Sequence, residues 1–191
     1  MLYTNASFVA FEHENNELAK TLIEKAISLI SEDHDPVRFF IAKNCESIGL
    51  IEQAIKVLEP FKQYSVKASE MLVKLLLTSE EPTRDEQAEQ IVDELIQTGN
   101  ASQNILHAKA EIALRRENIS EALDPLITSH RINPSIYAAY NIVAVKLQLQ
   151  QKEDFDEYIT YLKDSHSPKA VMLAAVALDY LNNRGTAEEL A

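Results

Sequence analysis

An alanine that recurs at nearly constant spacing limits the fold of this chain more than any other feature. The separations are 35, 34 and 34 residues, and the positions are Ala19, Ala54, Ala88 and Ala122. Each alanine is followed four positions later by a larger apolar residue, namely Ile23, Leu58, Val92 and Leu126. A spacing of four residues places both side chains on one face of an α-helix. The pattern therefore predicts a series of helical repeats, each about 34 residues long.

Composition favours an all-α fold. Only 3 of the 191 residues are Gly, and long stretches are rich in Ala, Leu, Ile, Glu, Lys and Gln, which lose little freedom on entering a helix. Hydrophobic residues make up 46% of the chain, which is enough to bury a substantial core. We expect helices near residues 4–14, 16–30, 36–48, 51–63, 67–79, 84–98, 101–116, 119–131, 134–150, 154–164 and 168–182.

A small residue followed four positions later by a larger apolar one, at a period of 34, resembles the tetratricopeptide family. The match is best over residues 48–54, where Gly49 occupies the family's inter-helix turn and Ile51 replaces its usual aromatic residue. Residues 132–134 close the fourth unit as the family's terminal proline does, although the family's tryptophan is absent. The resemblance implies a right-handed α-solenoid of about five helical hairpins, followed by a C-terminal capping helix.

The expected repeats lie at residues 2–31, 35–64, 67–98, 101–132 and 134–164, within a single domain that spans residues 1–191. Three first-helix starts carry a capping residue before a proline: Asp35-Pro36, Asn133-Pro134 and Ser167-Pro168. In the fifth repeat Tyr158 and Leu162 fit the apolar pair if the preceding turn is two residues longer. The capping helix is expected at residues 168–182, with a stop at residues 182–185.

Charge and hydropathy argue against two classes of partner. The chain has 30 acidic and 18 basic residues, and this net charge of −12 repels nucleic acids and anionic lipids. The longest basic run is Arg115-Arg116, and the longest apolar run, residues 170–178, is too short to span a bilayer. We therefore expect neither nucleic-acid binding nor membrane insertion. The N-terminus also lacks a secretory signal, so the expected location is cytoplasmic.

The sequence contains no recognisable catalytic or metal-binding motif. There is no His-Glu-x-x-His, no Gly-rich phosphate loop and no Gly-x-Ser-x-Gly, and the five histidines are scattered between repeats. Adjacent residues at 12–14 and 33–35 point in different directions, so neither set converges on one ion. The lone Cys45 occupies a small position of a first helix and is expected to be buried. We predict a protein with no catalytic residues, no metal and no cofactor.

The resemblance implies a binding surface as well as a fold. In tetratricopeptide proteins the first helices line a concave groove that contacts a partner peptide or helix. The corresponding positions here are Asn5, Phe8, Phe39, Phe40, Lys43, Lys74, His107, Glu111 and Asn141. For each of Phe39 and Phe40, a position in the groove and a position in the core are equally expected, because one of two adjacent residues must turn inward. Lys43 and Lys74 are cations in an acidic chain and could receive an anionic group of the partner, while a plain solvated lysine is the alternative.

Three functional interpretations follow. The leading one is a protein–protein interaction scaffold or adaptor, free-standing or part of a larger bacterial regulatory or envelope-assembly protein. The second is a dedicated chaperone of a bacterial secretion system, because residues 33–40 and 49–54 resemble the second repeat of type III secretion translocator chaperones. The third, an enzyme or small-molecule binder, would need a deep pocket with convergent titrating groups, and no motif supports it.

The last expected helix is apolar over much of its circumference. Part of that surface must cover the fifth hairpin. The remainder, expected at Met172, Val176 and Tyr180, would be open to a second copy, a neighbouring domain or the partner. A homodimer through this helix is therefore one arrangement that the sequence leaves open.

Overall fold

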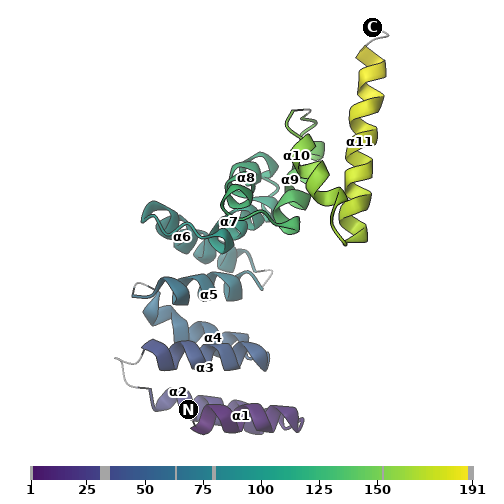
Figure 1. The fold of residues 1–191 in the computed structure, drawn as a ribbon. Helices are drawn as coiled ribbons and strands as arrows, with labels where there is room; N and C mark the ends of the chain where they lie inside the picture. Colours follow the sequence, from purple (N-terminus) through teal and green to yellow (C-terminus); the bar gives the residue numbers. More distant parts are fainter. Residues whose placement is uncertain (1, 31–34, 63, 79–80, 152, 189–191) are drawn as a thin grey trace. The chain divides into compact units, whose positions relative to one another are not determined.

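Every regular element is a helix in the described part of the chain, which in this computed structural model comprises residues 2–30, 35–62, 64–78, 81–151 and 153–188 (Figure 1). The predicted all-α class is confirmed. The helices fall into two compact units, Met1–Asn100 and Ala101–Ala191. The expected assignment of both to one domain stays a prediction.

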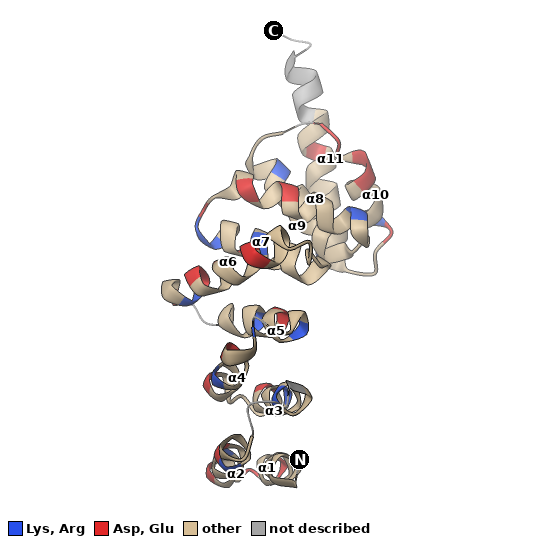
Figure 2. Cartoon of the chain, turned by 90° about the vertical axis from the view of Figure 1, so that its left-hand side faces the viewer, with Lys and Arg blue, Asp and Glu red and all other residues tan. Residues whose placement is uncertain are grey.

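The first unit consists of three helical hairpins. They are α1 (Leu2–Glu12) with α2 (Asn16–Ser28), α3 (Asp35–Ser47) with α4 (Ile51–Leu58) and the 3-10 turn η1 (Glu59–Phe61), and α5 (Val66–Leu76) with α6 (Pro82–Gln97). We call the leading helix of each hairpin the first helix and its partner the second helix. Within this unit the first helices α1, α3 and α5 form one layer, and the second helices α2 and α4 lie in a row beside that layer (Figure 2).

The second unit contains two hairpins and a closing helix. They are α7 (Gln103–Arg115) with η2 (Ile119–Ala122) and α8 (Leu123–Ile132), α9 (Ile136–Gln148) with α10 (Asp156–Lys163), and α11 (Pro168–Glu188). The closing helix packs against both α9 and α10. Tyr158 and Leu162 of α10 are buried, so the longer turn expected before the fifth second helix is confirmed.

The recurring alanines are buried where the sequence pattern puts them. Ala54, Ala88 and Ala122 have no exposed surface, and Ala19 is 2% exposed. Their apolar partners one turn later are buried too: Ile23, Leu58, Val92 and Leu126. Each pair belongs to a second helix, or to the turn that begins it, and faces the first helix of the same hairpin. The helical repeat is therefore confirmed, whereas the expected bounds of the individual repeats stay a prediction.

Four of the first helices end with the same left-handed turn. Gly49 takes φ 76° after α3, as the sequence suggests for a glycine, and Glu14, Glu117 and Gln150 take φ between 57° and 61° after α1, α7 and α9. The next residue in each case donates its backbone N–H to the carbonyl five residues earlier, as Leu50 does to Cys45 at 2.8 Å. The three non-glycine residues carry a steric cost of about 1 kcal/mol each, so the turn geometry outweighs local preference.

Two expected helix boundaries are wrong, and a proline explains each difference. The expected helix at 51–63 ends at Leu58 and continues as η1, because Pro60 lacks the N–H that an α-helix needs. The expected cap Asn133 is extended, as residues before proline prefer, and α9 starts later with Ser135 as its cap. The Ser135 hydroxyl accepts a hydrogen bond from the Ala138 N–H at 3.1 Å. Asn133 instead donates to the Gln103 side chain at 3.2 Å.

The closing helix is longer than the sequence suggests. α11 continues to Glu188, past the expected stop at residues 182–185. A glycine lowers helix stability by about 1 kcal/mol but does not end a helix unless its backbone turns left-handed. Among the described residues no helix is long and apolar enough to cross a membrane.

The buried alanines give a direct test of the repeat register. Ala122→Leu adds volume where helices cross without free space, so the free energy of unfolding should fall by roughly 1–3 kcal/mol. Ala175→Leu is the matched control, because Ala175 is exposed on α11 and should tolerate the larger side chain. Urea midpoints measured by circular dichroism report both. Equal midpoints for the two variants would show that Ala122 does not lie at a tight crossing.

Candidate partner-binding faces

The expected groove residues of the first unit lie on its layer of first helices. Asn5, Phe8, Lys43 and Lys74 are exposed, whereas Phe39 and Phe40 are both half-buried. Neither phenylalanine is therefore fully a core residue or fully a surface residue. We call these six residues the N-terminal face.

Both lysines of the N-terminal face have close neighbours. Lys74 Nζ of α5 pairs with Glu46 Oε1 of α3 at 2.5 Å, and both residues belong to first helices. Lys43 Nζ lies 5.7 Å from the centroid of the Phe39 ring, one turn earlier on the same helix. The positive charge that was expected to meet an anionic partner is thus partly neutralised at Lys74.

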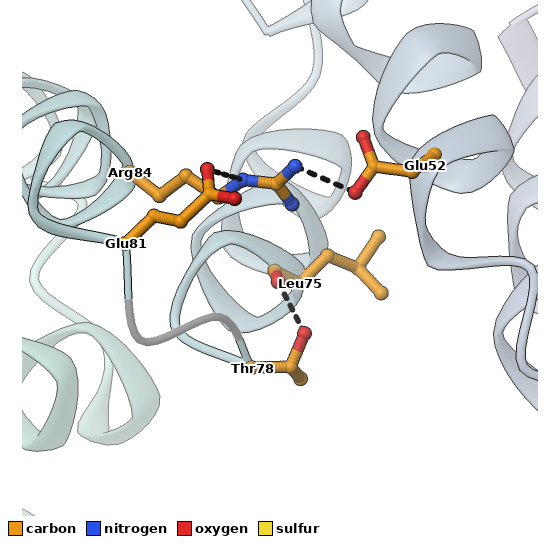
Figure 3. Close-up of polar contacts among 5 residues, drawn as sticks. All are labelled: Glu52, Leu75, Thr78, Glu81 and Arg84. Carbon is orange, nitrogen blue, oxygen red and sulfur yellow. Dashed lines mark hydrogen bonds and ion pairs between the residues drawn. The ribbon is translucent and has the colours of Figure 1, made fainter.

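Ion pairs connect the second and third hairpins, one between their first helices and one between their second helices. The Lys74–Glu46 pair joins the first helices α3 and α5. On the other side Arg84 of α6 reaches Glu52 of α4 at 2.6 Å, and its Nε also contacts Glu81 at 3.2 Å (Figure 3). Exposed ion pairs contribute up to about 1 kcal/mol each to the free energy of unfolding. These contacts therefore set how the second and third hairpins align more than they stabilise the fold.

The expected residues of the second unit gather around a tyrosine. His107 of α7 and Tyr137 of α9 have ring centroids 4.6 Å apart. Burial and the nearby Glu111 carboxylate both raise the pKa of Tyr137, in that order of size. Asn141, one turn after Tyr137, donates from Nδ2 to the Tyr137 carbonyl at 2.9 Å. We call these four residues the C-terminal face.

The His107 ring forms a hydrogen bond with a buried hydroxyl group. Its Nε2 lies 2.7 Å from the Oγ of Ser129, which belongs to α8 and has no exposed surface. Burial lowers the pKa of His107 below its usual value, so the ring is neutral at pH 7. The contact connects the first helix α7, the second helix α8 and the exposed Tyr137 through one side chain.

Tyr137 belongs to this face but was not among the groove positions expected from the sequence. It is 49% exposed, although it carries a large aromatic ring. The signal was present, because Tyr137 precedes Asn141 by four residues and thus lies on the same side of α9. Glu111 also pairs with Arg115 at 2.6 Å, one turn further along α7, which the list of groove positions did not include.

The chemistry available on both faces is that of binding. A ring with an exposed edge can stack on another side chain, and amide and carboxylate groups can accept or donate hydrogen bonds. Burial raises the pKa of the Cys45 thiol to about 12, which keeps it protonated at neutral pH. No group of His, Cys, Asp and Glu among the described residues has the geometry of a metal site.

The lowered pKa of His107 predicts how stability depends on pH. The folded state holds a proton on this ring less well than the unfolded chain does. Its contribution to stability is therefore complete above the ordinary pKa of about 6.5 and is lost as the pH falls through the folded value. His107→Gln keeps a polar partner for Ser129 and cannot titrate.

Urea unfolding of both proteins, at about pH 7.5 and about pH 5, separates this histidine from other titrating groups. The wild-type protein should lose more stability on acidification than His107→Gln does. Identical losses would mean that the environment of His107 does not oppose protonation.

Comparison with known proteins defines the fold and leaves the specific role open. No family model matches the chain, and no curated protein matches it. Two solved structures are similar. MamA from AMB-1 shares 13% identity with a TM-score of 0.60, covering 90% of this chain and 95% of that one. A MamA ArsTM double mutant from RS-1 shares 13% identity with a TM-score of 0.61, covering 92% and 94%. At this identity the similarity concerns the fold alone, and the chain has a tetratricopeptide-like helical-repeat fold.

Proposed function

We propose that this chain is a non-catalytic scaffold that holds another protein through its first helices. The observation that carries the proposal is the C-terminal face, where the exposed Tyr137 ring packs against the His107 ring and Asn141 donates to the Tyr137 main-chain carbonyl. Aromatic rings that are exposed yet fixed by neighbours supply contact area with little loss of freedom, which is why tyrosine is frequent at the centre of protein interfaces.

The composition of the face indicates the kind of partner. Tyr137 offers an apolar ring, Asn141 an amide and Glu111 a carboxylate that is already paired with Arg115. Such a mixture suits a peptide or helix that presents an apolar side chain beside backbone or side-chain polar groups. The N-terminal face, with Phe8 and Lys43 exposed, offers the same combination on the first unit.

Two finer proposals are compatible with this scaffold. A dedicated secretion chaperone would hold an amphipathic client, and the exposed apolar residues of α1, among them Leu2 and Val9, favour such a client. A homodimer through α11 would use Met172 and Val176, which are 66% and 52% exposed, while Tyr180 is half-buried. Both stay predictions.

The test compares two neighbouring exposed residues of α9. Proteins retained from a lysate of the source organism are identified by mass spectrometry, and the one retained in stoichiometric amount is purified. Its affinity is then measured for Tyr137→Ser and for Ile136→Ser. Ile136 is 40% exposed but points about 100° away around the helix, so it is the matched control.

Tyr137→Ser should weaken binding by about tenfold or more, because a central aromatic residue contributes more than rim contacts. Ile136→Ser should change the affinity by less than about twofold. A partner that binds Tyr137→Ser as tightly as the wild-type protein would exclude the C-terminal face as its binding site.

A further inference from the structure

Arg38 of α3 is a half-buried cation with no anionic partner among the side chains that the structure describes. Its guanidinium carbon lies 4.2 Å from the centroid of the Phe61 ring, so the charge stacks on an aromatic face. Its Nε is buried and has no hydrogen-bond partner among the residues that the structure describes. Burying an arginine partly removes its water, and stacking on an aromatic ring replaces only some of that interaction.

Three other arginines of the described residues differ from Arg38. Arg84 meets two carboxylates, Glu52 and Glu81 (Figure 3). Arg115 meets Glu111. Arg131 is exposed and can be solvated by water. Among the described side chains, a half-buried arginine that contacts no carboxylate is an exception in a chain with 30 acidic residues. Glu59, the acidic residue of η1, is exposed and makes no ion pair with it.

The Phe61 ring that stacks on Arg38 has a second aromatic residue beside it among the described residues. Tyr64 is 73% exposed, and its ring centroid lies 6.1 Å from that of the buried Phe61. Lys62 is exposed between them in the sequence. Tyr64 and Lys62 also line a hollow of about 210 Å³ between the start of α5 and the end of α6. All of these groups belong to the first unit, at the end of the second hairpin where α3 meets η1.

We propose that Arg38, Phe61 and Tyr64 form a binding site for a side-chain carboxylate of an acidic peptide segment in a partner protein. The planar guanidinium presents paired N–H donors that match the two oxygens of a carboxylate. Phe61 fixes the cation in place, and Tyr64 offers a ring for an apolar neighbour of the acidic residue. The net charge of −12 repels acidic peptides elsewhere, so binding would concentrate where a positive charge has no partner among the described side chains.

This site is separate from the C-terminal face and does not depend on it. It uses one residue of α3 and two from η1 and the segment that follows, none of which belongs to the expected groove positions. The scaffold proposal can therefore fail while this site holds, and the reverse is also true. Occupation would be favoured when the partner carries Asp or Glu beside an aliphatic or aromatic residue.

The experiment uses the buried Arg38 Nε–H as its own reporter in NMR spectra of the isotope-labelled full chain. The signal is assigned by its disappearance in Arg38→Lys. The probes are two blocked peptides, acetyl-Leu-Glu-Leu-amide and acetyl-Leu-Gln-Leu-amide. The glutamate peptide should shift the Arg38 signal and bind at least about tenfold more tightly than the glutamine peptide, because a charged acceptor strengthens both hydrogen bonds. The Arg84 Nε–H, which already donates to Glu81, should not move.

Variants decide whether the binding is specific to this site. Arg38→Lys keeps the charge but loses the planar fork, and it should weaken binding of the glutamate peptide by about tenfold. Tyr64→Ser, at an exposed residue, should weaken it as well without altering the circular dichroism spectrum. Arg131→Lys, at an exposed arginine of the second unit, should leave it unchanged.

Three results would overturn the proposal. They are equal binding of the two peptides, unchanged binding to Arg38→Lys, and loss of binding in Arg131→Lys. A phosphoserine peptide of the same length that binds about tenfold more tightly than the glutamate peptide would assign the site to phosphate instead of carboxylate.

Discussion

The architecture depends on a small side chain where the two helices of each of the first four hairpins cross. Ala54, Ala88 and Ala122 have no exposed surface, and no larger side chain would let the paired helices approach as closely. The apolar residue one turn later fills the space beside each crossing. Because this contact recurs about every 34 residues, one side of each first helix in these hairpins packs against its partner helix and another side stays exposed.

The periodic and apolar parts of the fold could be predicted because they depend on residue size and spacing alone. The alanine anchors, their partners and the longer turn before Tyr158 all follow from such a pattern. The helix ends could not be predicted as well, since they depend on competition between local signals. Asn133 is a good capping residue, yet the proline after it favours an extended backbone, and Ser135 caps α9 instead.

The sequence placed the candidate groove residues on first helices, but it could not predict their contacts, and partner binding at these residues stays a prediction. The sequence places Lys74 on a first helix, but its pairing with Glu46 joins residues in different repeats and depends on side-chain direction. His107 was expected on the surface of a groove, and the structure adds that Ser129 holds it from the second helix. Arg38 was not among the predicted site residues, because its stacking on Phe61 and its buried Nε without a hydrogen bond are visible only in three dimensions.

Amide hydrogen exchange tests most directly whether the alanine crossings are the stable centre of each hairpin. Slow exchange marks hydrogen bonds that open only when the surrounding packing is lost. We expect the slowest amides of the two units to include Leu58, Val92 and Leu126, each one turn after a buried alanine. The amides of α1, whose exposed side chains include Leu2 and Val9, should exchange faster. Uniform exchange along the helices, or the strongest protection in α1 or α11, would contradict it.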